Sequence, residues 1–200
     1  MNNEPFMDKK IIERLKFARV NIPKAKINLI INGSIMTIEQ FDTINKNKLL
    51  DEMIINNYNK TMKLNSNIQK IYNAYKNISL NFKVKIDIRF CNEILSNRAN
   101  TSPNNKGEKI IKSYCTLPFT DFNVNPYGIA TLCCCDAKEV TNLGDVNKQT
   151  ISEIFNSEKY NQVRESLKNG RNGYGFCKYC DFIDAGLRQK EIKKYLKLSN

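Results

Sequence analysis

The residues best suited to chemistry in this chain are its cysteines, because the sequence contains no histidine. The absence of imidazole excludes a Ser-His-Asp or Cys-His nucleophile, a histidine general base and any zinc site that needs histidine. The N-terminus has no apolar stretch of a signal peptide, so we expect a cytoplasmic protein with reduced thiols. Grouped thiols then indicate metal binding before disulfides. Seven cysteines are present: Cys91, Cys115, Cys133, Cys134, Cys135, Cys177 and Cys180.

Four of these cysteines have spacings suited to a metal site. Cys115 and Cys133 flank a predicted turn at Gly128, and Cys177 and Cys180 form a CxxC pair after 43 intervening residues. A CxxC turn places two sulfur atoms within reach of one inorganic centre, and the two arms of a hairpin can supply two more. Four thiolates are a complete ligand set for a tetrahedral zinc ion or for a [4Fe–4S] cluster. The spacing therefore predicts a metal centre of one of these two kinds.

The first hundred residues have the pattern of alternating strands and helices. Three short runs are apolar or alternate with the period of a strand: Lys26–Asn32, Glu52–Asn57 and Phe82–Phe90. Three segments have helical signals: Ile11–Ala18 after the cap candidate Asp8, Thr37–Leu49 with a capping box, and Asn67–Lys76. Strands separated by such helices form a parallel sheet through right-handed crossovers. We therefore expect an α/β domain at residues 1–96.

The composition changes at Asn97–Glu108, where Ser, Pro, Asn and Gly accumulate, so we predict a linker at residues 97–112. Beyond the linker, two strands of a hairpin and one amphipathic helix are predicted: Phe119–Val124, Ile129–Leu132 and Thr150–Leu167. A lysine-rich helix is predicted at residues 186–200. The cysteine-rich part is thus a small α+β domain at residues 113–185.

These motifs together resemble the SPASM/Twitch auxiliary-cluster domain of radical SAM enzymes. The resemblance covers roughly Ser113–Asp181 and depends on four motifs: Cys115-x12-Gly128-x4-Cys133, Leu143-Gly-Asp-Val146, Ile151-Ser-Glu-Ile-Phe155 and Cys177-x-x-Cys180. No cysteine follows Cys180, so the pattern is closer to the one-cluster Twitch form. The resemblance implies one auxiliary [4Fe–4S] cluster that accepts an electron or positions substrate, with four ligands: Cys115, Cys133, Cys177 and Cys180.

The cysteines outside this set have other interpretations. The Gly-x4-Cys register of the family selects Cys133 from the triplet. Cys135 lies on the same strand face as Cys133 and is the alternative ligand, whereas Cys134 faces the other way. Cys134 and Cys135 are otherwise structural thiols at a strand end. Cys91, at the end of a predicted strand, is interpreted as a small buried hydrophobic residue.

The N-terminal half resembles part of a radical SAM barrel. Asn3-Glu4-Pro5 is similar to the end of the glycine-glycine-glutamate motif, which makes Glu4 a candidate contact to S-adenosylmethionine. The other interpretation of Glu4 is a disordered terminal residue. The CxxxCxxC loop that holds the catalytic cluster occurs nowhere in the sequence. The resemblance implies a partial (β/α) barrel of about three parallel strands, which uses S-adenosylmethionine only if a complementary radical SAM N-terminal segment is supplied.

Three other functional classes remain open: a stand-alone iron–sulfur electron carrier, a zinc-stabilised four-cysteine interaction module, and a truncated reading frame without an independent role. Nucleic-acid binding is not favoured by the formal charge of +12, because only seven of the 32 basic residues are Arg and the lysines are dispersed. No apolar run approaches the roughly 18 to 20 residues of a membrane span. We therefore expect neither a nucleic-acid nor a membrane partner, and the sequence does not identify the substrate.

Overall fold

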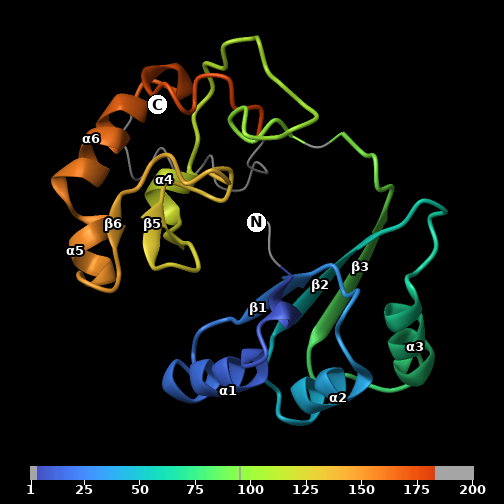
Figure 1. Cartoon of the computed structure of the whole chain (residues 1–200). Helices are drawn as coiled ribbons and strands as arrows, with labels where there is room; N and C mark the ends of the chain where they lie inside the picture. Colours follow the sequence, from blue (N-terminus) through green and yellow to red (C-terminus); the bar gives the residue numbers. More distant parts are fainter. Residues whose placement is uncertain (1–3, 95, 183–200) are drawn as a thin grey trace, which may run out of the picture. The chain divides into compact units, whose positions relative to one another are not determined.

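The computed structural model, shown in Figure 1, describes residues 4–94 and 96–182. The chain forms two compact units that divide between Glu93 and Ile94. The helix predicted at residues 186–200 lies outside the described residues. Within the described part of the chain, no helix is both long enough and apolar enough to cross a membrane.

The N-terminal unit contains a three-stranded parallel sheet with β2 at its centre. Its strands are β1 (Asn28–Ile31), β2 (Glu52–Tyr58) and β3 (Lys83–Arg89). Its helices are the 3-10 helix η1 (Pro5–Met7), α1 (Ile11–Asn21), α2 (Ile38–Lys46) and α3 (Ser66–Tyr75). The predicted α/β domain with about three parallel strands is therefore confirmed at this level.

The core of this unit joins β2 to the helices on either side of it in sequence. Met53 and Ile55 of β2 are almost fully buried and belong to one cluster with Phe41 of α2 and Ile68 of α3. Buried residues alternate along β2 because successive side chains of a strand point to opposite faces. The apolar side chains of α2 and α3 thus pack on the buried residues of β2, Met53 and Ile55, which the alternating pattern of the strand predicts to be inside.

The C-terminal unit contains a small antiparallel sheet and several short helices. Its strands, in sheet order, are β4 (Asn123–Val124), β5 (Ile129–Thr131) and β6 (Gly144–Asp145). Its helices are α4 (Leu117–Thr120), α5 (Ile151–Phe155), α6 (Glu158–Leu167) and the 3-10 helix η2 (Arg171–Gly173). β4 and β5 form the predicted hairpin, and Gly128 in its turn has a φ of +87°, a conformation that favours glycine.

The bounds of two predicted elements in this unit are wrong. Phe119 and Thr120 end the helix α4 instead of beginning a strand, and Pro118 in the first turn of α4 suits a helix start. The helix predicted at Thr150–Leu167 is two helices. Ser157 separates them because its side chain accepts the backbone N–H of Tyr160 and caps α6. The two-residue strand β6 was not predicted.

We predict that Gly33→Ala destabilises the N-terminal unit. Gly33 follows β1 with a φ of +71°, and a Cβ at this position would lie 2.3 Å from Cδ1 of Ile68. The strained backbone and the close contact should lower the free energy of unfolding by about 1–3 kcal/mol. Denaturant unfolding of the variant measures this loss. Gly175→Ala is the matched control, because a Cβ there meets nothing within 4 Å. Equal losses for the two variants would contradict this explanation.

Candidate metal centre

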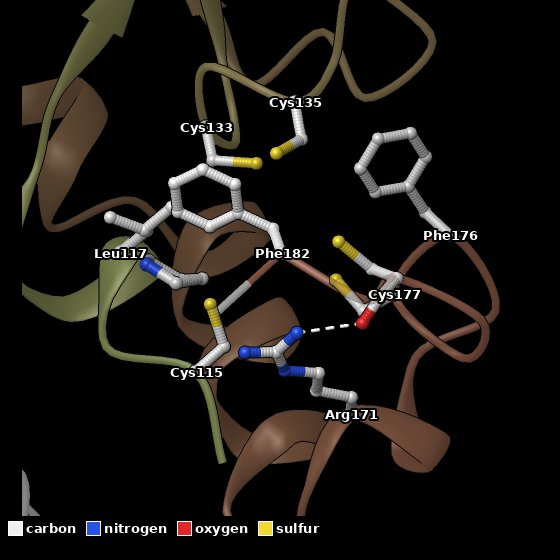
Figure 2. Close-up of a pocket in the computed structure, with 10 residues that line it drawn as sticks. Cys115, Leu117, Cys133, Cys135, Arg171, Phe176, Cys177 and Phe182 are labelled. Carbon is white, nitrogen blue, oxygen red and sulfur yellow. Dashed lines mark hydrogen bonds between the residues drawn. The ribbon is translucent and has the colours of Figure 1, made fainter. Parts of the chain in front are cut away.

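Five of the seven cysteines line one pocket of the C-terminal unit, shown in Figure 2: Cys115, Cys133, Cys135, Cys177 and Cys180. The free space of this pocket, counted with its mouth, is about 300 Å³. The remaining lining is apolar apart from one guanidinium, and consists of Leu117, Pro118, Phe176, Phe182 and Arg171. The structure thus brings together the four cysteines predicted as ligands and the cysteine named as their alternative.

The cysteine triplet follows β5 in a hydrogen-bonded turn, in which the backbone N–H of Asp136 donates to the carbonyl of Cys133 at 3.1 Å. Cys133 and Cys135 are 7% and 2% exposed and both line the pocket, whereas Cys134 is exposed to solvent. Two of the three adjacent thiols are therefore placed to bind the same centre. Cys133 and Cys135 are thus both candidate ligands of this site.

Asp136 fixes the loop that carries the triplet. Its buried carboxylate accepts hydrogen bonds from the backbone N–H of Val140, at 2.9 Å, and of Thr141, at 3.0 Å. The Thr141 hydroxyl donates to the same carboxylate and accepts the backbone N–H of Leu132. Leu132 is itself fully buried in the core of the unit. The triplet is thus held at both ends, by the core before it and by Asp136 after it.

The CxxC pair lies on a tight turn in which the backbone N–H of Cys180 donates to the carbonyl of Cys177 at 3.0 Å. The chain around this turn is tied to Asn97, which is 1% exposed. Asn97 donates its backbone N–H to Oδ1 of Asp181 at 2.7 Å and its side-chain amide to the carbonyl of Tyr179 at 2.6 Å. The segment predicted as a linker therefore begins with a buried residue that packs on the CxxC pair.

The same segment also contacts the triplet loop. The Thr101 hydroxyl donates to the carbonyl of Cys135 at 3.0 Å. Between Asn97 and Thr101, three consecutive non-glycine residues, Arg98, Ala99 and Asn100, have φ angles of 48°, 54° and 63°. Left-handed backbone of this kind costs about 1–2 kcal/mol per residue. Contacts at both ends stabilise the strained turn, so this segment is a structural part of the site.

Burial and hydrogen bonds among the sulfur atoms set the protonation of the thiols. Burial raises the pKa of Cys115 to about 11, an effect that the nearby Arg171 guanidinium partly offsets. Hydrogen bonding to Cys133 raises the pKa of Cys135. The hydrogen bond with Cys135 lowers the pKa of Cys180 to about 6. Because metals bind cysteine as thiolate, a metal that enters this pocket must displace protons.

The donor set fits an iron–sulfur cluster. Such clusters are held by cysteine thiolates, and five thiols line this pocket. Within residues 4–94 and 96–182, no group of three or more Cys, Asp or Glu side chains is arranged to hold a single metal ion. Figure 2 shows the side chains of Cys115, Cys133, Cys135 and Cys177 around one pocket. Five thiols are more than one tetrahedral zinc ion binds, and they suffice for a cluster with four thiolate ligands.

Arg171 lines the pocket, and no pattern in the sequence predicted it. Its side chain is 4% exposed, and its Nη1 donates to the carbonyl of Cys180 at 2.7 Å. No motif marks this residue, and its only local signal is the preceding Gly170 at the start of a turn. Asn97 and Asp136 were missed for the same reason, since polar residues in loops carry no pattern of their own.

Glu4 and Cys91 lie outside this pocket. Glu4 is 8% exposed, and its carboxylate accepts the backbone N–H of Asn32, at 2.6 Å, and that of Phe6, at 3.5 Å. A buried and hydrogen-bonded Glu4 does not fit the interpretation as a disordered terminal residue, and its contact with S-adenosylmethionine stays a prediction. Cys91 follows β3 and is exposed, so the expectation that it is buried is wrong.

This chain is similar to known proteins in sequence and in fold. The SPASM family model, described as an iron–sulfur cluster-binding domain, matches residues 115–181. The crystal structure of BtrN in complex with AdoMet and 2-DOIA matches with a TM-score of 0.72 and 21% identity, over 90% of this chain and 70% of that chain. SeMet BtrN in an open conformation matches with a TM-score of 0.62 and 20% identity, over 91% and 69%. At these identities the likeness shows the fold alone. No curated protein matches significantly.

We predict that Cys133→Ala greatly reduces metal bound after anaerobic reconstitution, while the adjacent Cys134→Ala keeps it near the wild-type level. Cys133 lines the pocket, whereas Cys134 is exposed and outside the pocket lining. Metal remaining in Cys133→Ala should disappear in the double variant with Cys135→Ala, because Cys135 is the nearest substitute. Elemental analysis of the three proteins checks this. Equal losses in Cys133→Ala and Cys134→Ala would show that the assignment within the triplet is wrong.

Proposed function

We propose that this chain, whose residues 115–181 form a SPASM iron–sulfur cluster-binding domain, is the auxiliary-cluster part of a radical SAM enzyme. It holds one [4Fe–4S] cluster through four ligands: Cys115, Cys133, Cys177 and Cys180. One observation carries the proposal: the four thiols line one pocket, and all four lie within residues 115–181, which match the SPASM family model. Cys135 lies beside Cys133 as the substitute ligand.

When bound, the cluster supplies one-electron chemistry or a fixed surface for substrate. The residues of the chain hold it and control its surroundings. Four thiolates complete the cluster, and the apolar side chains of Leu117, Phe176 and Phe182 limit water at the sulfur atoms. Such thiols persist in a reducing compartment, so we place the protein in the cytoplasm.

S-adenosylmethionine is proposed as the cofactor of the complete enzyme, with the N-terminal unit as part of its (β/α) barrel. BtrN, which has a similar fold, is seen in complex with AdoMet. Open parallel sheets bind ligands beyond the carboxyl ends of their strands. Glu4 lies at such an end, because its carboxylate accepts the N–H of Asn32, the residue after β1. The proposed partner is a segment that supplies the CxxxCxxC loop, which this sequence does not contain.

The proposal predicts that anaerobically reconstituted protein is brown and contains about four iron and four sulfide per chain. Iron and sulfide analysis of the full chain measures both. Cys91→Ala is the matched control, because Cys91 is exposed and outside the pocket, and it should retain the full amount. Stoichiometric zinc without sulfide, in protein from cells with adequate iron, would support the zinc-stabilised module instead.

A second prediction concerns the reductive cleavage of S-adenosylmethionine. The 200-residue chain alone should not form 5′-deoxyadenosine, because a cluster with four thiolate ligands has no open iron position. Co-expression with a segment that carries the CxxxCxxC loop should restore cleavage. An anaerobic assay with a strong reductant compares the two preparations. Robust turnover by the chain alone would contradict the assignment as an auxiliary-cluster part.

A further inference from the structure

A buried guanidinium lies among the thiols of the metal-binding pocket. Arg171 lines the same space as the five cysteines, as Figure 2 shows, and is 4% exposed. Its Nη1 donates to the carbonyl of Cys180 at 2.7 Å. Its Nε and Nη2 donate to the carbonyl of Tyr114 at 3.4 and 3.3 Å. The guanidinium is therefore held between the segments that carry Cys180 and Cys115, two of the proposed ligands.

The backbone fixes the position from which Arg171 enters the pocket. Gly170 has a φ of +110°, and a Cβ there would lie 2.2 Å from the carbonyl oxygen of Lys112. The backbone N–H of Arg171 donates to the carbonyl of Ser113 at 3.2 Å. Through these two contacts, the start of η2 packs closely against Lys112 and Ser113, which precede Cys115. A close approach of this kind requires glycine at position 170 and sets the origin of the arginine side chain.

The charge of Arg171 has no acidic partner within the described residues. None of the ion pairs formed there includes Arg171, and no Asp or Glu lines the pocket. A buried cation without a carboxylate partner is unfavourable, and hydrogen bonds to carbonyl oxygens offset only part of its lost hydration. A cluster ligated by four thiolates has a net negative charge, and it would bind in the same space.

We propose that Arg171 is the counter-charge of the cluster, and that it raises the reduction potential of the cluster. The inference depends on the proposed function and deepens it. A positive charge stabilises the loaded pocket. It stabilises the reduced cluster more, because reduction adds one electron to an already negative group. In that step a substrate radical loses one electron and is oxidised, the cluster gains that electron, and no bond to Arg171 forms or breaks. Arg171 thus favours electron acceptance over substrate positioning as the role of the cluster.

The test is a potentiometric titration of the anaerobically loaded full chain, followed by electron paramagnetic resonance. Arg171→Gln keeps a donor in the pocket and removes the charge. This variant should lower the equilibrium constant for reduction of the cluster by about tenfold or more. For a one-electron couple, a tenfold change lowers the reduction potential by about 59 mV. Arg171→Lys keeps the charge and should retain most of the wild-type potential. Lys148→Gln is the control, because it removes the same charge from an exposed side chain outside the pocket lining, and it should shift the potential much less.

An unchanged potential in loaded Arg171→Gln would overturn the inference. If Arg171→Gln binds no iron, the unfolding of the metal-free proteins decides. Wild-type stability of the metal-free variant would support a role toward the cluster, whereas a large loss of that stability would show a merely structural role and overturn it. Failure of the proposed function would look different from these results, because the unmodified chain would then contain zinc and no sulfide. In that case the inference about Arg171 would be rejected together with the proposed function.

Discussion

The C-terminal unit depends on one constraint: sulfur atoms from three distant chain segments must meet around one space. A helical turn and a hairpin separate Cys115 from Cys133, and the strand β6 and the helices α5, α6 and η2 separate the triplet from the CxxC pair. The strands of this unit have only two or three residues each, so ladder hydrogen bonds alone cannot fix the loops. Polar contacts of Asp136, Asn97 and Arg171 position them instead. A bound cluster would link the same segments covalently, so metal binding and folding should be coupled.

Elements set by neighbouring residues could be predicted from the sequence. The capping box at Thr37 and Gln40 forms as predicted, and the alternating run Phe82–Phe90 contains β3. Prediction failed where a single residue outweighed a longer pattern. Ser157 caps a new helix inside an amphipathic segment, and Pro118 lies in a helical turn where a strand was predicted. The strand β6 exists through its pairing with β5, and two residues are too few to produce a periodic signal.

The candidate site could be predicted only in part. The spacing of the cysteines indicated which thiols gather, because a CxxC turn and a hairpin are local structures. The contacts that hold them join residues far apart, such as Asn97 with Asp181 and Arg171 with Tyr114. Composition gave the opposite signal at Asn97, since a segment rich in Asn, Ser and Gly predicts a linker. A polar residue acquires such a partner only through the tertiary fold, and its type alone does not reveal that partner.

Differential alkylation of the cysteines, resolved by mass spectrometry in the metal-free and the anaerobically loaded chain, tests the central claim most directly. If one cluster occupies the pocket, loading should strongly slow alkylation of the four proposed ligands and leave Cys91 unchanged, because Cys91 is exposed and outside the pocket. The comparison with the metal-free chain separates ligation from burial. Loading-dependent protection of Cys91, or unchanged alkylation of two or more of the proposed ligands, would contradict a cluster at this position.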